Sequence, residues 1–147
     1  MFRGFATLNF YADDVAAARD WYAQLFGVEA YYAYPPAPAA PAYVEFRIGD
    51  DEDEIGIIDR RYAPPGDAAS PGGAIMHWHV DDLRSTLDRL LAMGATEHRP
   101  ITEHGGEGSG FVTASVIDPF GNVLGVMNNP HYLEILAARK QVAASPS

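Results

Sequence analysis

Apolar and polar residues alternate over residues 6–12, ATLNFYA, as expected for a strand with two different faces. An amphipathic helix is predicted directly afterwards, because apolar residues recur at helical spacing over residues 15–25. Asp13 or Asp14 offers a side-chain oxygen that would cap this helix, and Gly27 suits a left-handed helix end. This part of the chain therefore predicts a strand followed by a capped helix.

The same pattern returns from Ala74 as AIMHWHVDDLRSTLDRLLAMG, with apolar residues Leu83, Leu87, Leu90 and Leu91 along the second helix. The equivalent residues Asp14 and Asp82 are 68 positions apart. The segment EIGIID over residues 54–59 is echoed by VLGVMN over residues 123–128. A steady period over most of the chain indicates two copies of one supersecondary unit.

Three strand-like segments follow each predicted helix, so each copy is predicted to be a β-α-β-β-β unit of an α+β protein. The predicted boundaries are 5–60 for the first module, 61–73 for a linker and 74–130 for the second module. Residues 131–147 are predicted to form a short C-terminal helix and a tail.

Composition and charge exclude several classes of function. The 147 residues contain no cysteine, which excludes disulfides, thiolate catalysis and cysteine-ligated metals. The net charge of −10 argues against nucleic acids and anionic membrane surfaces as partners. No apolar run is long enough for a membrane helix, and the first residues do not resemble a signal peptide. A cytoplasmic protein is therefore expected, and the Ala-, Asp-, Arg- and Pro-rich composition favours a bacterial source.

Three segments carry a resemblance to a known family: NFYADDVAAARDWYAQLFG, HVDDLRSTLDRLLAMG and IDPFGNVLGVM. In this order and spacing they resemble the vicinal-oxygen-chelate superfamily of glyoxalases, bleomycin-resistance proteins and extradiol dioxygenases. The resemblance covers roughly residues 5–130. It implies two curved mixed sheets around a concave cavity, helices on the outside, and often a homodimer.

The resemblance also implies where a divalent metal would bind, with one ligand on the opening strand and one on the closing strand of each module. These positions fall on Thr7 and Gly56 in the first module, and on Ile75 and Gly125 in the second. Such residues cannot hold a divalent metal that requires oxygen or imidazole ligands. We therefore expect a metal-independent protein without a cofactor. As an alternative, a register shift of two residues would place Asn9 and His77 at ligand positions.

A ligand cavity is expected on the same strand faces, because side chains alternate along a strand. On the second opening strand, His77 and His79 would share the face of Ile75, while Met76, Trp78 and Val80 would pack against the helix. The closing-strand glycines are expected to leave open space. The predicted ligand-binding residues are Thr7, Asn9, Tyr11, Glu45, Gly56, Ile75, His77, His79, Gly125 and Met127.

Two segments leave alternatives open. His77 and His79 could be structural, could contact a ligand or act as an acid or base, or could bind a metal with Glu54. Tyr43, Glu45 and Arg47 alternate along one strand and form either an exposed polar face or part of the cavity.

The favoured function is a small-molecule-binding protein of the bleomycin-resistance type that sequesters an aromatic or amphipathic compound. The alternatives are a glyoxalase-like metal-dependent lyase or isomerase, a dioxygenase-family activity, or a metal-free enzyme with His77 or His79 as the base. A dimeric interaction module without a small ligand is the third possibility. The sequence predicts neither the ligand nor the reaction.

Overall fold

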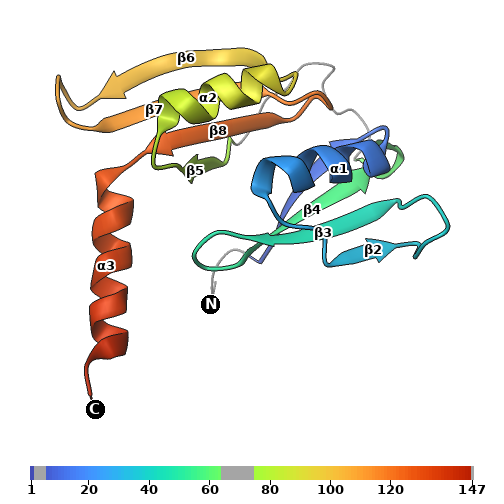
Figure 1. The fold of residues 1–147 in the computed structure, drawn as a ribbon, viewed down its shortest axis with the longest axis horizontal. Helices are drawn as coiled ribbons and strands as arrows, with labels where there is room; N and C mark the ends of the chain where they lie inside the picture. Colours follow the sequence, from blue (N-terminus) through green and yellow to red (C-terminus); the bar gives the residue numbers. More distant parts are fainter. Residues whose placement is uncertain (2–5, 64–74, 147) are drawn as a thin grey trace. The chain divides into compact units, whose positions relative to one another are not determined.

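The predicted β-α-β-β-β order occurs twice in the computed structural model, which describes residues 1, 6–63 and 75–146 (Figure 1). The first copy consists of β1 (Leu8–Ala12), α1 (Val15–Phe26), β2 (Tyr32–Tyr34), β3 (Tyr43–Ile48) and β4 (Asp53–Asp59), followed by a short 3-10 helix, η1 (Arg60–Tyr62). The second consists of β5 (His77–His79), α2 (Leu83–Ala92), β6 (Thr96–His104), β7 (Phe111–Ile117) and β8 (Val123–Asn128), followed by α3 (Pro130–Ala144). Most of the predicted linker, residues 64–73, lies outside the described residues.

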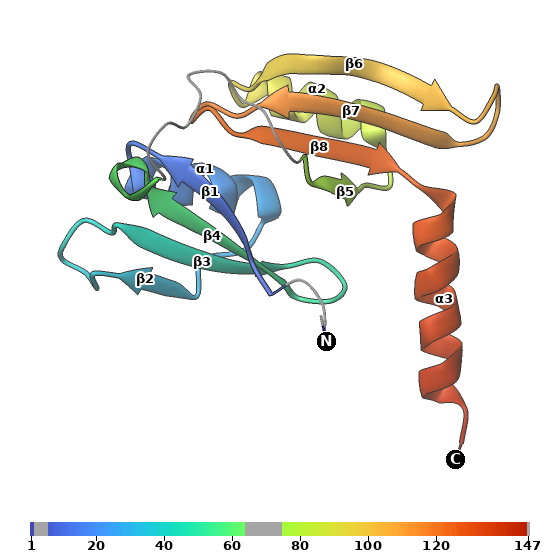
Figure 2. The same ribbon diagram turned by 180° about the vertical axis from the view of Figure 1, so that it is seen from behind.

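Each copy forms one four-stranded mixed sheet, which confirms the predicted α+β fold (Figure 2). The strand order is β1-β4-β3-β2 in the first sheet and β5-β8-β7-β6 in the second. The opening strand pairs in parallel with the closing strand, and the other pairs are antiparallel. Helix α1 packs mainly against β3 and β4, and α2 packs mainly against β7 and β8.

Both helices of the repeat begin at the predicted aspartates. The Asp14 carboxylate accepts a hydrogen bond from the Ala17 N–H at 2.9 Å, which decides between Asp13 and Asp14 as the cap of α1. The Asp82 carboxylate accepts one from the Ser85 N–H at the same distance. Gly27 ends α1 in the left-handed region at φ 72°, as predicted.

The core of each unit lies between its helix and one face of its sheet. The buried apolar residues of the first unit are Phe10, Ala12, Val15, Ala18, Tyr22, Val44, Phe46, Ile55 and Ile57. Those of the second unit are Leu83, Leu87, Leu90, Ala95, Ala114, Val116, Leu124 and Val126. Because side chains alternate along a strand, the polar positions of the sheets lie on the faces opposite these cores.

Two apolar residues that were expected in the core are partly exposed. Met76 is 37% exposed and Leu91 is 39% exposed, so these two predictions were wrong. Helix α2 lies over β7 and β8, whereas Met76 precedes the edge strand β5. Leu91 lies in the last turn of α2, at the flank of the stripe formed by the buried Leu83, Leu87 and Leu90.

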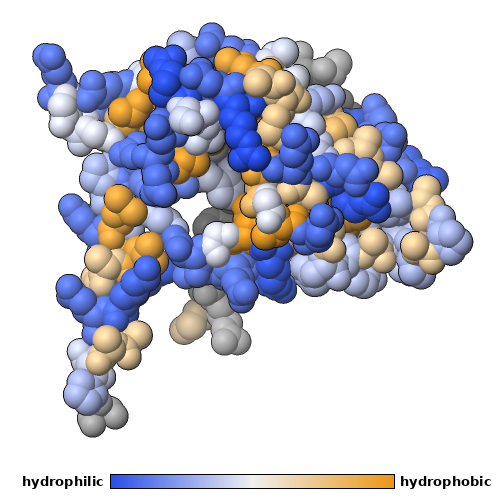
Figure 3. Space-filling view, viewed as in Figure 1, coloured by the Kyte–Doolittle hydropathy of each residue, from blue (hydrophilic) through white to orange (hydrophobic). Residues whose placement is uncertain are grey.

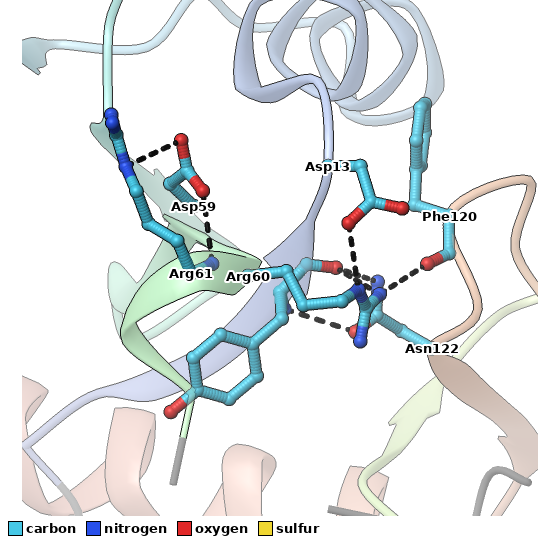
Figure 4. Close-up of polar contacts among 7 residues, drawn as sticks. Asp13, Asp59, Arg60, Arg61, Phe120 and Asn122 are labelled. Atoms are coloured by element: carbon cyan, nitrogen blue, oxygen red, sulfur yellow. Dashed lines mark hydrogen bonds and ion pairs between the residues drawn. The ribbon is translucent and has the colours of Figure 1, made fainter. Parts of the chain in front are cut away.

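The residues Phe120–Asn122 of the second sequence repeat belong to the first compact unit. This unit comprises Met1–Pro71 and Phe120–Asn122, and the second comprises Gly72–Pro119 and Val123–Ser147. Arg60 donates to the Phe120 carbonyl at 2.6 Å and pairs with the Asp13 carboxylate at 3.2 Å (Figure 4). The Phe120 ring also meets the Trp21 ring edge-on, with 6.1 Å between the centroids.

Helix α3 is longer than the predicted short C-terminal helix and has 15 residues. Asn129 caps it by accepting a hydrogen bond from the His131 N–H at 3.0 Å, and Pro130 occupies its first turn. None of its residues is buried. In the part of the chain that the structure describes, every helix is too short or too polar to cross a lipid bilayer.

Candidate functional site

The polar face of the first sheet carries several of the predicted site residues. Gly56 lies between Asn9 on β1 and Glu45 on β3 in the strand register. Directly opposed residues of neighbouring strands point to the same side of a sheet, so Asn9 and Glu45 share this face. Asn9 is exposed and Glu45 is half-buried, whereas Phe10 on the other face is buried. Thr7 is exposed and precedes β1, so it lies at the edge of this group.

The closing-strand glycine of the first unit does not leave open space, contrary to the prediction. Gly56 is buried, and a β-carbon placed on it would overlap the side-chain oxygen of Asn9. The same β-carbon would lie 2.9 Å from Cε2 of Tyr43. The side chains of both neighbouring strands therefore lie over this glycine and use the space that its missing side chain provides.

Two tyrosine hydroxyls hold the Glu45 carboxylate in place. Tyr31 donates to one carboxylate oxygen, and Tyr43 donates to the other at 2.5 Å. The Tyr31 hydroxyl is also 3.4 Å from the Glu54 carboxylate. The sequence left two roles open for Glu45, an exposed polar residue or a part of the cavity. In the structure Glu45 belongs to an ordered hydrogen-bonded group.

Arg47 completes this group of residues on the first sheet. Its guanidinium pairs with the Glu54 carboxylate at 3.1 Å and lies 5.4 Å from the centroid of the Tyr31 ring. A cation is thus already held between an aromatic ring and a carboxylate on this face. We call Tyr31, Tyr43, Glu45, Arg47 and Glu54 the tyrosine–glutamate cluster.

The cluster raises the pKa of both phenols. The hydrogen bond to Glu45 is the largest cause for Tyr31 and raises its pKa from 10.0 to about 12. Burial is the largest cause for Tyr43, followed by its hydrogen bond to Glu45, and both raise its pKa. The two phenols therefore remain protonated donors at neutral pH and fix the orientation of Glu45.

The second unit gathers histidines and hydroxyl groups on the polar face of its sheet. Gly125 lies between His77 on β5 and Ser115 on β7, and Met127 lies between His79 and Thr113. His98 Nδ1 is 2.9 Å from the Ser115 hydroxyl, and His104 Nε2 is 2.8 Å from the Thr113 hydroxyl. Four of the five histidines of the protein therefore gather at this face, and Ile75 precedes it as a half-buried residue.

The expected open space at Gly125 is also filled. A β-carbon on this buried glycine would lie 2.7 Å from Cδ2 of the His77 ring and 2.8 Å from the Met76 carbonyl oxygen. The ring of the neighbouring parallel strand lies against the glycine backbone. The prediction of a glycine-floored opening was therefore wrong in both units, for the same reason.

The His79 side chain is almost fully enclosed, with 7% of its surface exposed. Its Nδ1 accepts a hydrogen bond from the Asn129 N–H at 3.1 Å, so the neutral ring carries its proton on Nε2. Its ring stacks on Tyr132 with 4.9 Å between the centroids and 14° between the planes. Nε2 is buried and has no hydrogen-bond partner among the described residues. The nearest carboxylate oxygen, on Asp81, is 3.9 Å away.

The remaining predicted site residue, Tyr11, is held by its backbone. Its N–H donates to the Asn122 side-chain oxygen at 3.1 Å, and its carbonyl accepts from the Asn122 side-chain nitrogen at 2.9 Å. The sequence predicted only a turn at Asn122 and did not predict this contact. His98 and His104 were also missed, because β6 contains register shifts that the residue pattern does not show.

The residues present do not fit a metal site of the kind that the resemblance implies. Thr7, Gly56, Ile75 and Gly125 provide a single hydroxyl group between them. Across residues 6–63 and 75–146, no three histidine, aspartate or glutamate side chains are placed to share a metal ion. The alternative ligands have other contacts, since Glu54 pairs with Arg47 and His79 bonds to Asn129.

Two modules of this topology, each with an opening strand parallel to its closing strand, define the class of protein to which the chain belongs. The model of the Glyoxalase/Bleomycin resistance protein/Dioxygenase superfamily matches residues 4–126. The chain therefore belongs to this superfamily. Among proteins with a curated description, none matches the sequence.

Solved structures share the fold at low sequence identity. The fosfomycin resistance protein FosX from Mesorhizobium loti is 14% identical, with a TM-score of 0.63 over 92% of this chain and 99% of that chain. A glyoxalase-related enzyme from Fulvimarina pelagi is 17% identical, with a TM-score of 0.63 over 88% and 90%. TioX from Micromonospora sp. ML1 is 17% identical, with a TM-score of 0.61 over 85% and 98%.

Proposed function

We propose that the protein binds and sequesters an aromatic or amphipathic small molecule in the cytoplasm, without a metal ion. The observation that carries this proposal is the tyrosine–glutamate cluster, in which Tyr31 and Tyr43 fix the Glu45 carboxylate on the polar face of the first sheet. Binding sites for small organic molecules combine aromatic surface with a few fixed polar groups.

The surroundings of the cluster favour a ligand that carries a positive charge. Tyr31 is 52% exposed and Tyr32 is 46% exposed, so aromatic surface is available beside the carboxylate. Arg47 shows that the Tyr31 ring and the Glu54 carboxylate together accept a cation. The net charge of −10 attracts the same class of ligand over longer distances.

The surroundings of His77 and His79, the two candidate bases, support sequestration of a ligand better than they support catalysis. His77 lies against Gly125 and has no hydrogen bond to a carboxylate among the described residues, so no such group orients it. The His79 ring is covered by Tyr132, and its Nδ1 is occupied by Asn129. A general base requires access to the substrate and a group that orients the imidazole.

The test is a thermal-shift screen of cationic, neutral and anionic amphipathic aromatics, followed by calorimetric titration of the strongest ligands. We expect cationic compounds to dominate, and Glu45→Gln to weaken their binding about tenfold, as expected for the loss of one charge-assisted contact. Glu107→Gln is the matched control, because Glu107 is exposed in the β6–β7 loop. Equal effects of the two variants would contradict a binding role for Glu45.

We also propose that the protein forms a homodimer, as the resemblance to its superfamily implies. Helix α3 supports this proposal, because Leu133 is 45% exposed, Ile135 is 43% exposed and Val142 is 78% exposed. Figure 3 shows hydrophobic surface on this helix. Burial of such residues against another surface is favourable. Sedimentation velocity of the intact protein is expected to give the mass of two chains, and a monomer would contradict the proposal.

A further inference from the structure

Arg47 contacts the tyrosine–glutamate cluster in the way that a small cationic ligand would. Its guanidinium lies over the Tyr31 ring, with 5.4 Å between Cζ and the ring centroid. One terminal nitrogen donates to the Glu54 carboxylate at 3.1 Å, and the other donates to the backbone carbonyl of Glu52 at 3.3 Å. The ring face, the carboxylate and the carbonyl thus form a set of contacts that one planar guanidinium satisfies.

The two partners of this ion pair differ in their exposure to solvent. The Glu54 side chain is 19% exposed, whereas the Arg47 side chain is 49% exposed. Arg47 can turn into solvent with little loss, because ion pairs of half-exposed side chains contribute little to stability. Glu54 cannot follow it, since it is part of β4, and a largely buried carboxylate without a partner is unfavourable. The geometry therefore favours the exchange of Arg47 for another cation over its simple release.

The β3–β4 turn that provides the carbonyl has an unusual backbone conformation at Glu52. Its φ is 53°, and among the described residues no other residue except glycine has a positive φ. This conformation is uncommon for a residue with a side chain, and such positions are concentrated at binding and active sites. Asp50, Asp51 and Asp53 add negative charge in the same turn, which attracts cations to it.

We propose that a guanidinium or amidinium group of a small molecule replaces Arg47 between the Tyr31 ring and the Glu54 carboxylate. The proposal rests on the proposed binding function and names the cationic group that the site recognises. A neutral group does not replace Arg47, because it would leave the Glu54 carboxylate without a cation. An ammonium group fits less well than a guanidinium, because it is a compact point charge that neither lies flat on a ring nor presents a planar fork of donors.

Arg47 should lower the apparent affinity for such a ligand, because the ligand binds only the molecules from which the Arg47 guanidinium has turned away. Arg47→Met should therefore raise the affinity about fivefold, as expected for the loss of a half-exposed ion pair that competes with the ligand. Arg61→Met is the matched control, since Arg61 also pairs with a carboxylate, on Asp59, and lies 5.1 Å from the centroid of the Tyr62 ring. It removes the same charge elsewhere in the unit and should leave the affinity unchanged.

The test is an NMR titration with three probes that share a butyl chain: butylguanidinium, its neutral planar counterpart butylurea, and butylammonium. In the wild type, butylguanidinium should move the Nε–H signal of Arg47 toward that of a free arginine side chain, and butylurea should not. Butylammonium should bind about fivefold more weakly than butylguanidinium. In Arg47→Met, butylguanidinium should shift the ring signals of Tyr31.

Two carboxylate variants locate the contact. Glu54→Gln in the Arg47→Met background should abolish the gain in affinity for butylguanidinium, and Glu107→Gln, in the exposed β6–β7 loop, should not. Equal binding of butylguanidinium and butylurea would overturn the proposal. An equal gain in Arg61→Met, or no binding of butylguanidinium to Arg47→Met, would overturn it as well.

The two proposals fail in different ways. If the ligands from the thermal-shift screen bind the wild type and leave the Arg47 signal unmoved, the exchange of Arg47 is wrong and the proposed function stands. If butylguanidinium binds beside Tyr31 and Glu54 while no screened compound binds the wild type, the guanidinium site exists and the proposed sequestration function is wrong.

Discussion

The Asn122 side chain hydrogen-bonds both backbone groups of Tyr11, accepting from its N–H at 3.1 Å and donating to its carbonyl at 2.9 Å. One amide side chain thereby pairs with β1 as a neighbouring strand would. Arg60 reinforces the contact, because its guanidinium donates to the Tyr11 carbonyl at 3.3 Å and to the Phe120 carbonyl at 2.6 Å. Three residues of the second sequence repeat are thus built into the first compact unit (Figure 4).

Loss of this contact should destabilise the first unit. Asn122→Ala removes both hydrogen bonds to Tyr11, and we expect it to lower the free energy of unfolding by about 1–3 kcal/mol, because the partners are partly buried. Urea denaturation followed by circular dichroism measures this loss. Gln141→Ala, in the exposed part of α3, is the control and should change the free energy by less than about 0.5 kcal/mol. A similarly small effect of Asn122→Ala would show that the contact contributes little.

Alkaline pH should destabilise the fold through the tyrosine–glutamate cluster. The pKa of Tyr31 is about 12 in the folded protein and 10.0 as its ordinary value, so between these values the folded state holds a proton that the unfolded state loses. The contribution of Tyr31 is therefore fully present below pH 10.0 and lost as the pH approaches about 12. The raised pKa of Tyr43 acts in the same direction.

Glu45→Gln tests this dependence, because Glu45 is the largest cause of the shift at Tyr31. Tyrosinate absorbance at 295 nm should rise at lower pH in this variant than in the wild type. Glu54→Gln is the matched control and should move the curve less, since Glu54 is the smallest of the causes at Tyr31. A larger displacement by Glu54→Gln would reverse the assignment.

Substitution of either closing-strand glycine by alanine should destabilise the protein. The two variants should differ in how far a second substitution, which removes the clashing side chain, restores stability. Gly125→Ala places a β-carbon 2.8 Å from the Met76 carbonyl and 2.7 Å from the His77 ring. We expect a loss of about 1–3 kcal/mol in stability, as for other overpacked sites. Because a carbonyl is part of the clash, His77→Ala should restore only part of the loss.

At Gly56, by contrast, the three atoms nearest to the added β-carbon all belong to the side chains of Asn9 and Tyr43. Truncation of those side chains in Asn9→Ala/Tyr43→Ala should therefore remove the additional cost of Gly56→Ala. Denaturation midpoints of the single, double and triple variants provide both comparisons. Full rescue of Gly125→Ala by His77→Ala would mean that the backbone accommodates the new methyl group.

The local elements of this fold follow from short-range chemistry and were predicted from the sequence. Asp14 and Asp82 cap the helices, and Gly27 ends the first one, because each acts within one helical turn. The repeat predicted the β-α-β-β-β order of both units, since a recurring pattern of strand and helix defines the same unit twice. The two mixed sheets were expected from the resemblance to the superfamily. The glycine floor of the predicted cavity was wrong, whereas ligand binding on these sheet faces stays a prediction.

The details of the candidate sites depend on contacts that a residue pattern does not contain. The position of Ser115 beside His98 depends on the register of β6, which shifts between Glu97 and Arg99 and again before Thr102. The open space expected at Gly125 depended on where the His77 ring turns, and that choice is made by packing in three dimensions. The Asn122 contact joins residues 111 positions apart, beyond the reach of any local signal.

Metal-independent binding is tested by calorimetric titration of the strongest cationic aromatic ligand into metal-stripped protein and into protein incubated with Ni, Zn, Mn or Fe(II), with the bound metal measured by elemental analysis. We expect the same affinity in every preparation, within about twofold, and no stoichiometric metal, because the donor positions are Thr7, Ile75 and two glycines. Binding that occurs only in a preparation with one metal ion per chain would contradict it.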